Sequence, residues 1–298
     1  MNYLFVAGIL SSIVAEGSDK PELGNFLDKF NEASAGFGRQ SSWVPELRIF
    51  SSAEADEVKP KFKYPFLGFI RIDKHTDQEY LCSGTLLDSQ SLLTSAHCVT
   101  EDYVRFFKVS FHRHNKKLKS KSENGTEHRF RKVIAHESYE LKDGIPSNDI
   151  ALVRLATPVP RLESKASLNY IRLPSTKLGN PPSDVELTIV GWGLSKPKGE
   201  QSDVLRHAEK LHLTDECYTK DSGLTKEQHL CATNAGNADP CSNDSGGPLL
   251  APATDDGFIQ IGIIPAQPKC GSSKKPGVYT RILGQVNWIK STQAKLSA

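Results

Sequence analysis

Short apolar or alternating runs, separated by Gly, Pro, Asn, Asp and Ser, make up most of the chain from about residue 66 onward. Runs of this length bounded by turn residues are typical of β-strands. We therefore predict strands over residues 66–72, 80–87, 92–94, 106–111, 150–155, 187–191, 259–264 and 278–282. Many short strands at such intervals favour an antiparallel barrel or sandwich.

The C-terminal segment follows a helical period instead. Ile282, Val286 and Ile289 recur at i, i+4 and i+7, which places them on one face of a helix. Lys290 and Lys295 lie toward its end, where positive charge suits the helix dipole. The pattern predicts a closing amphipathic helix.

The N-terminal segment has a third pattern. Residues 4–15 are uncharged and mostly apolar, too short to span a bilayer comfortably but of the right length for the core of a signal peptide. A buried N-terminal helix is the alternative, but the abrupt change at Glu16 to charged, turn-forming residues favours the signal peptide. Residues 16–48 contain no Cys and few β-branched residues, and we interpret them as a detachable segment.

Composition and charge exclude several classes of protein. The chain has 298 residues, of which 38% are apolar and 24% charged, with a net charge of +2. These values are ordinary for a globular protein. They give no reason to expect a disordered chain, a multi-pass membrane protein or a dedicated nucleic-acid binder.

The chain contains six cysteines: Cys82, Cys98, Cys217, Cys231, Cys241 and Cys270. They form no Cys-x-x-Cys motif, and no His pair has zinc-finger spacing, so the sequence predicts no metal site and no other cofactor. An even count permits three disulfides, but six cysteines allow fifteen pairings, and the sequence alone does not choose among them.

Three short stretches carry residues suited to catalysis. Residues 92–98 read Leu-Leu-Thr-Ser-Ala-His-Cys, residues 148–155 read Asn-Asp-Ile-Ala-Leu-Val-Arg-Leu, and residues 239–249 read Asp-Pro-Cys-Ser-Asn-Asp-Ser-Gly-Gly-Pro-Leu. Taken singly, each has a structural explanation: a core histidine, a turn-capping aspartate and a serine in a glycine-rich turn. Together they suit nucleophilic catalysis. A serine hydroxyl needs an adjacent base, imidazole can accept its proton near neutral pH, and a buried carboxylate orients the imidazole.

In their order and flanking residues, these motifs resemble the trypsin/chymotrypsin family of serine endopeptidases. Further similarities are Gly191-Trp192-Gly193, Pro276-Gly277-Val278-Tyr279-Thr280 and Asn287-Trp288-Ile289. The resemblance covers the chain from about Ile49 to the C-terminal helix. It implies an all-β fold of two packed antiparallel six-stranded β-barrels with a C-terminal helix, and an active site between the barrels.

The resemblance also implies roles for individual residues. His97 would be the general base and then the acid, Asp149 would orient it, and Ser245 would attack the scissile carbonyl. The backbone N–H groups of Asn243 and Ser245 would form the oxyanion hole, although Asn243 stands where the family usually has Gly. The implied disulfides are Cys82–Cys98, Cys217–Cys231 and Cys241–Cys270.

Substrate selection is implied by the residues around the primary specificity pocket. Asp239 lies six residues before the nucleophile, where a carboxylate selects Arg or Lys through a charge-assisted hydrogen bond. Gly277 matches the small residue that leaves the pocket open. Pro265 and Gln267 depart from the family's usual Ser-(aromatic)-Gly strand, so we expect altered subsites and narrow specificity or weak activity on small substrates.

Activation is implied by the run that begins at Arg48. Cleavage between Arg48 and Ile49 would free an N-terminus that pairs with Asp244, beside the nucleophile; Arg39 is a second basic candidate for the cut. The expected organisation is thus a signal peptide over residues 1–15, a propeptide over 16–48 and a protease domain over 49–298.

The segment 105–132 is strongly basic. Its ten bases are Arg105, Lys108, Arg113, Lys116, Lys117, Lys119, Lys121, Arg129, Arg131 and Lys132, against two acids. This charge argues against the calcium loop found here in some relatives. We read the segment as a basic surface hairpin that is either a solvated loop or a site for a polyanion or an acidic partner. Within it, Asn124 begins an Asn-Gly-Thr glycosylation motif.

The sequence therefore predicts a secreted serine endopeptidase, made as a zymogen, that cuts after Arg or Lys. The alternative is a weakly active or non-catalytic homologue with a binding or regulatory role. Expected partners are protein substrates, an activating protease, a protein inhibitor and a polyanion at residues 105–132. We expect a monomer that binds neither nucleic acid nor membrane.

Overall fold

The computed structural model describes residues 55–72, 81–99, 101–163, 169–177, 179–193, 202–234, 245–265 and 276–297. The predicted signal peptide, propeptide and cleavage site, with Arg48 and Ile49, lie outside these residues. So do the following site residues: Asp239, Cys241, Asn243, Asp244, Gln267 and Cys270.

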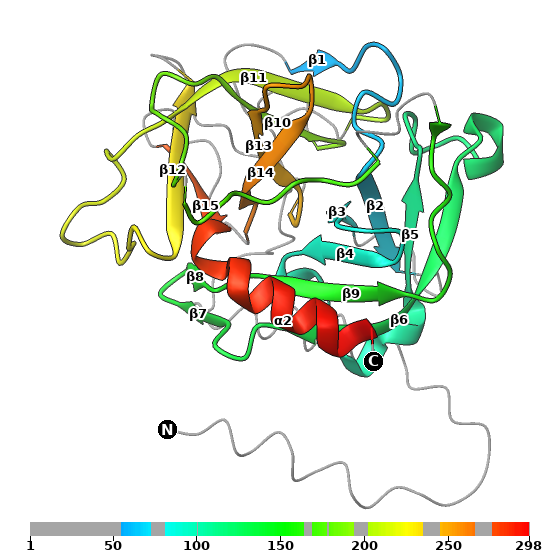
Figure 1. The fold of residues 1–298 in the computed structure, drawn as a ribbon, viewed down its shortest axis with the longest axis horizontal. Helices are drawn as coiled ribbons and strands as arrows, with labels where there is room; N and C mark the ends of the chain where they lie inside the picture. The colour runs from blue at the N-terminus through cyan, green and yellow to red at the C-terminus, as the bar shows by residue number, and fades with distance from the viewer. Residues whose placement is uncertain are drawn as a thin grey trace, which may run out of the picture. The chain divides into compact units, whose positions relative to one another are not determined.

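The first half of the described chain forms a closed antiparallel barrel of six strands in the order β2-β3-β4-β9-β6-β5 (Figure 1). The strands are β2 Leu67–Ile72, β3 Leu81–Leu86, β4 Ser91–Thr94, β5 Phe107–Phe111, β6 Thr126–Ala135 and β9 Ala151–Leu155. Alternate residues, such as Ile70, Val109 and Val153, are fully buried. Because side chains alternate between the two faces of a strand, their neighbours point to the outer face of the barrel.

The second half contains a ring of six strands that closes where β11 pairs with β12. Its members are β10 Leu187–Gly191, β11 Arg206–Leu213, β12 His229–Asn234, β13 Pro248–Pro252, β14 Phe258–Ile263 and β15 Gly277–Arg281. The predicted pair of six-stranded barrels is thereby confirmed, with one addition. A two-residue strand, β1 Asp56–Glu57, pairs with β11 as a seventh strand.

Short helices and one hairpin complete the described chain. They are η2 Ala96–Cys98, η3 Glu101–Phe106, η4 Ser120–Glu123, the hairpin β7 Glu140–Lys142 and β8 Ile145–Ser147, η6 Leu283–Gln285 and α2 Val286–Ser297. Helix α2 confirms the predicted closing helix. None of the helices described is long and apolar enough to cross a bilayer.

Helix α2 packs into an apolar cluster that joins residues from both barrels. Val286 and Ile289 of α2 share this cluster with Leu93 and Leu152 of the first barrel and Ile263 of the second. Burying one such side chain contributes about 1.5–3 kcal/mol. The cluster therefore holds the two barrels together. Two of its members, Leu93 and Ile150, lie close in the chain to His97 and Asp149.

The basic segment 105–132 forms a hairpin whose two strands are part of the first barrel. It includes the end of η3, strand β5, η4 and most of β6, so two of its stretches are barrel strands. Arg113 is 7% exposed and its Nε donates to Oε2 of the buried Glu123, 3.0 Å away. The segment is a hairpin, since β5 pairs antiparallel with β6, but both strands belong to the barrel, and β6 buries His128, Phe130 and Val133 between charged outer positions.

Candidate active site

His97 and Asp149 are 52 residues apart in the chain, and the pairing of two strands brings them together. Strand β4 runs antiparallel to β9, with Thr94 opposite Ala151. His97 lies just after the end of β4, and Asp149 lies just before the start of β9. Both therefore emerge at the same end of the first barrel.

Two hydrogen bonds join the pair. His97 Nδ1 lies 2.7 Å from Asp149 Oδ2, and the backbone N–H of His97 donates to Asp149 Oδ1 over 2.9 Å. The Asp149 side chain is fully buried, and that of His97 is 12% exposed. A buried carboxylate that accepts from Nδ1 fixes the tautomer in which Nε2 can accept a proton. This geometry suits a general base.

The turn that carries Asp149 is held from the C-terminal end of the chain. Asn148 has φ of 50°, a left-handed conformation that Asn tolerates better than most residues. Its Oδ1 accepts a hydrogen bond of 2.8 Å from Gln285, immediately before α2. Thr280 of β15 donates to the backbone oxygen of Asp149 over 3.3 Å. The second barrel and η6 thus fix where the carboxylate points.

Ser245 lies in the turn that precedes β13 and is 7% exposed. Its backbone oxygen accepts a hydrogen bond of 2.8 Å from the N–H of Ser83 in β3. Gly246 has φ of 82°, and a Cβ there would overlap Thr94 Oγ1 and the oxygen of Ser83. Only glycine permits this approach, so the serine turn lies directly against the strands that lead to His97.

One carbonyl receives hydrogen bonds from both turns. The oxygen of Ile264 accepts 2.8 Å bonds from the N–H of Gly246 and from the hydroxyl of Ser95. Ser95 is two residues before His97, and Gly246 directly follows Ser245. The next residue after Ile264 is the buried Pro265, which has no side-chain hydroxyl. Ser95 therefore supplies a hydroxyl contact between the barrels at this point.

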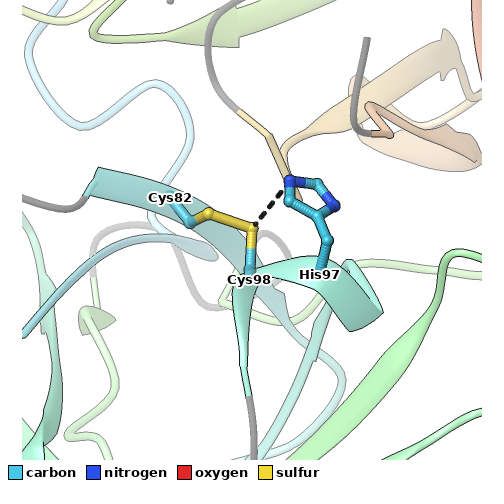
Figure 2. Close-up of side chains that lie close together, drawn as sticks. All are labelled: Cys82, His97 and Cys98. Carbon is cyan, nitrogen blue, oxygen red and sulfur yellow. Dashed lines mark hydrogen bonds between the residues drawn. A yellow bond between two sulfur atoms is a disulfide. The ribbon is translucent and has the colours of Figure 1, made fainter. Parts of the chain in front are cut away.

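Figure 2 shows the disulfide between Cys82 and Cys98 beside the His97 ring, whose Nε2 lies 3.6 Å from Cys98 Sγ. These three side chains place their ligand atoms within 4.8 Å of one another. Both sulfurs are bonded to each other, so neither is a thiolate that could bind a metal. The bridge ties β3, which holds Ser245, to the turn of His97.

The structure confirms two of the three implied disulfides, Cys82–Cys98 and Cys217–Cys231. The third and the predicted Asp239 fall outside the described residues. Gly277, the first residue of β15, lies opposite Ala232 of β12.

A cavity of about 240 Å³ lies beside Tyr218 and Arg281. None of the three predicted catalytic residues is among the residues that line it.

Sequence reasoning missed the residues that hold these turns, namely Ser83, Ser95, Thr280 and Gln285. Ser95 and Thr280 stood inside motifs that we used to recognise the site, but we considered only the catalytic side chains of those motifs. Ser83 and Gln285 carried no signal, because the fold brings them to partners more than 100 residues away in the chain.

Asn124, the predicted glycosylation residue, is exposed and ends η4 in a left-handed conformation with φ of 57°. The loop around it is organised by Arg113. This guanidinium donates to Ser120 Oγ over 2.8 Å and to the backbone oxygens of Asn115 and Leu118. These oxygen atoms of the loop thus accept hydrogen bonds from the buried Arg113 side chain.

Comparisons with known proteins agree with this geometry. The family model described as Trypsin matches residues 56–289. Venom plasminogen activator Haly-PA of Gloydius brevicauda is 33% identical over 215 residues, which cover 71% of this chain and 77% of that protein. The clotting factor G beta subunit of Tachypleus tridentatus is 28% identical, covering 75% of this chain and 74% of its own.

Transmembrane protease serine 11G of Mus musculus is 28% identical over 92% of this chain and 69% of its own length. The solved structure of GrC superposes with a TM-score of 0.66 and 26% identity, over 80% of this chain and 98% of that one. The family match spans both barrels and the start of the C-terminal helix, and the His97–Asp149 pair has the geometry that a serine protease requires. We conclude that the chain belongs to the trypsin family of serine proteases.

Proposed function

We propose that the chain is an active serine endopeptidase with His97, Asp149 and Ser245 as its catalytic triad. The observation that carries this proposal is the buried Asp149 carboxylate, which holds His97 through Nδ1 and the backbone N–H. A ring that donates through Nδ1 to a carboxylate has Nε2 as its nitrogen for proton transfer. The serine turn is anchored to Ser83 of β3 and to the oxygen of Ile264, which also accepts from Ser95 in the turn of His97.

In this reaction His97 Nε2 takes the proton of the Ser245 hydroxyl as the oxygen attacks the scissile carbonyl. Asp149 stabilises the imidazolium that results. The imidazolium then gives its proton to the leaving amine, and water repeats the sequence on the acyl-enzyme. The backbone N–H groups of Asn243 and Ser245 would stabilise the oxyanion.

The experiment is labelling of the chain, cut after Arg48, with a fluorophosphonate probe. We expect stoichiometric labelling of the wild type and none of the Ser245→Ala variant. A His97→Ala variant should label far more slowly, since the hydroxyl loses its base. Equal labelling of wild type and Ser245→Ala would refute the assignment of the nucleophile.

We further propose that the enzyme is secreted as a zymogen and cuts after Arg or Lys. The relatives named as plasminogen activators and as a clotting factor support a secreted protease. Asp239 and the Arg48–Ile49 bond support the specificity and the activation. A library of peptide substrates tests the first point: Asp239→Ser should lose the preference for basic residues. Arg48→Gln, left uncleaved, tests the second and should stay inactive.

The second candidate is a homologue with little catalytic activity that binds partners through the same fold. Pro265 favours it, because this residue offers Asp149 no hydroxyl. The labelling experiment separates the two functions: the binding protein would be unlabelled after cleavage, although folded.

A further inference from the structure

The turn that carries Asp149 is also held from the end of strand β6, through His136. This residue directly follows β6, which pairs antiparallel with β9. The backbone N–H of His136 donates to the oxygen of Ile150 over 3.0 Å. His136 is thus bonded to the residue that follows Asp149 in the chain.

The side chain of His136 acts on the residue that precedes Asp149. Its Nδ1 accepts a hydrogen bond of 3.1 Å from the N–H of Ser138. The backbone oxygen of Ser138 in turn accepts a bond of 3.1 Å from Nδ2 of Asn148. We call these three residues, His136, Ser138 and Asn148, the histidine bridge. It links the imidazole ring to the turn of the catalytic carboxylate.

The histidine bridge requires a neutral ring. An imidazole nitrogen that accepts from an N–H carries no proton, so the proton of neutral His136 is on Nε2. Burial lowers the pKa of His136, against the attraction of Glu137 and a side-chain hydrogen bond with Gln285. Trp288 of α2 stacks on the ring, with the two centroids 4.8 Å apart. The acceptor Nδ1 is therefore available at neutral pH and is held in place.

We propose that His136 is a positioning residue for Asp149. Asn148 has φ of 50°, and a left-handed residue other than glycine persists where its surroundings hold it. Both ends of the Asn148 amide are held, Nδ2 by the histidine bridge and Oδ1 by Gln285. Loss of the acceptor on His136 frees one end, so the Asp149 carboxylate is oriented less sharply toward His97. This inference rests on the proposed catalysis, in which that carboxylate orients the base.

The test separates the acceptor Nδ1 from the aromatic ring that carries it. His136→Phe keeps a ring against Trp288 but removes the acceptor. His136→Asn removes the ring but places Oδ1 where Nδ1 was. We expect His136→Phe to lower kcat on a peptide amide by about tenfold, because a small misplacement of the base is costly. KM should change by less than about twofold, and His136→Asn should recover most of the lost kcat.

The matched control is Trp288→Phe. This variant keeps an aromatic ring beside His136 but loses the indole N–H that donates to Glu137 over 2.8 Å. It should lower the thermal transition and leave kcat near wild type. A kcat that follows the thermal transition across all three variants would overturn the proposal, since His136 would then act on stability alone. Wild-type kcat in His136→Phe would also overturn it.

A second measurement does not depend on turnover. The Nδ1 proton of His97 lies in a short, charge-assisted hydrogen bond to Asp149 and gives a separate downfield NMR resonance. In a Ser245→Ala background, His136→Phe should shift or broaden this resonance, whereas His136→Asn and Trp288→Phe should leave it unchanged. A chain that fails to label with fluorophosphonate but shows this pattern would refute the proposed catalysis and leave this proposal standing. A chain that labels, with the same resonance in every variant, would refute this proposal alone.

Discussion

At the scale of single residues, the backbone oxygen of Ile264 has a larger role than its side chain would suggest. It accepts hydrogen bonds from Ser95 and Gly246, so the turns of His97 and Ser245 share one acceptor. The sequence could identify His97 and Asp149, since their motifs are local. It could not identify this acceptor, because any residue has a carbonyl and only the fold decides what donates to it.

Ser95→Ala should lower kcat several-fold with a small effect on KM, because the turn of His97 loses its direct bond to Ile264. The buried hydrogen bond is worth about 1 kcal/mol, so urea unfolding should show a loss of that size. Steady-state kinetics on a peptide substrate and urea unfolding check both expectations.

The matched control is Ser110→Ala. This serine is also buried in the first barrel, and its hydroxyl has no hydrogen-bond partner among the described residues. Its replacement should leave kcat and stability near wild type. A Ser95→Ala enzyme as active as Ser110→Ala would contradict the role of the hydroxyl.

At the scale of elements, the loop between β5 and β6 is built around an ion pair. Arg113 and Glu123 are both buried, and Glu123 also accepts from the backbone N–H groups of His114 and Asn115. In this segment the sequence predicted strand β5 but not β6, since β6 carries charged outer residues that concealed its buried alternation. Strands β11, β12 and β13 were missed as well.

Arg113→Met should destabilise the protein by about 3 kcal/mol, because it leaves the Glu123 carboxylate buried without its cation. Adding Glu123→Gln should recover part of this loss, since a neutral amide needs no cation and its oxygen can still accept from the N–H of Asn115. Urea unfolding of both variants measures the effect. A double variant less stable than Arg113→Met would contradict this account.

At the scale of the whole molecule, four histidines lie in surroundings that disfavour their charged form: His112, His128 and His207 are buried, and His136 is partly buried. Desolvation by burial lowers the pKa of His112, His128, His136 and His207 below the usual value of 6.5. Their positions depend on barrel closure by long-range pairings such as β6–β9 and β11–β12, which the sequence pattern does not specify. The family resemblance, rather than periodicity, is what predicted two closed barrels.

These histidines make the folded state sensitive to acid. The unfolded chain binds more protons than the folded chain once the pH falls below about 6.5, so stability is full above that pH and decreases as the pH falls through the folded pKa values. Below about pH 4.5, carboxylates with lowered pKa, such as Glu209, add to the loss. Thermal unfolding between pH 8 and 4 measures this dependence.

Replacing His128 by Gln should flatten the curve between pH 6.5 and 5, because the side chain no longer gains a proton on unfolding. His212→Gln, at a partly exposed position of β11, is the comparison. An equal flattening in both variants would show that burial is not the cause.

The pairing of β1 with β11 limits how far a newly cut N-terminus can travel. Ala55 is 2% exposed, and its oxygen accepts a 2.7 Å hydrogen bond from Arg206, so the chain is anchored there. A cut after Arg48 would leave a tether of six residues, 49–54, before this anchor, with a reach of about 20 Å. Within that reach the new terminus has a high effective concentration at any acceptor. Lengthening the tether with glycine and serine would lower this effective concentration, so tether length is a means of weakening the proposed activation without changing His97, Asp149 or Ser245.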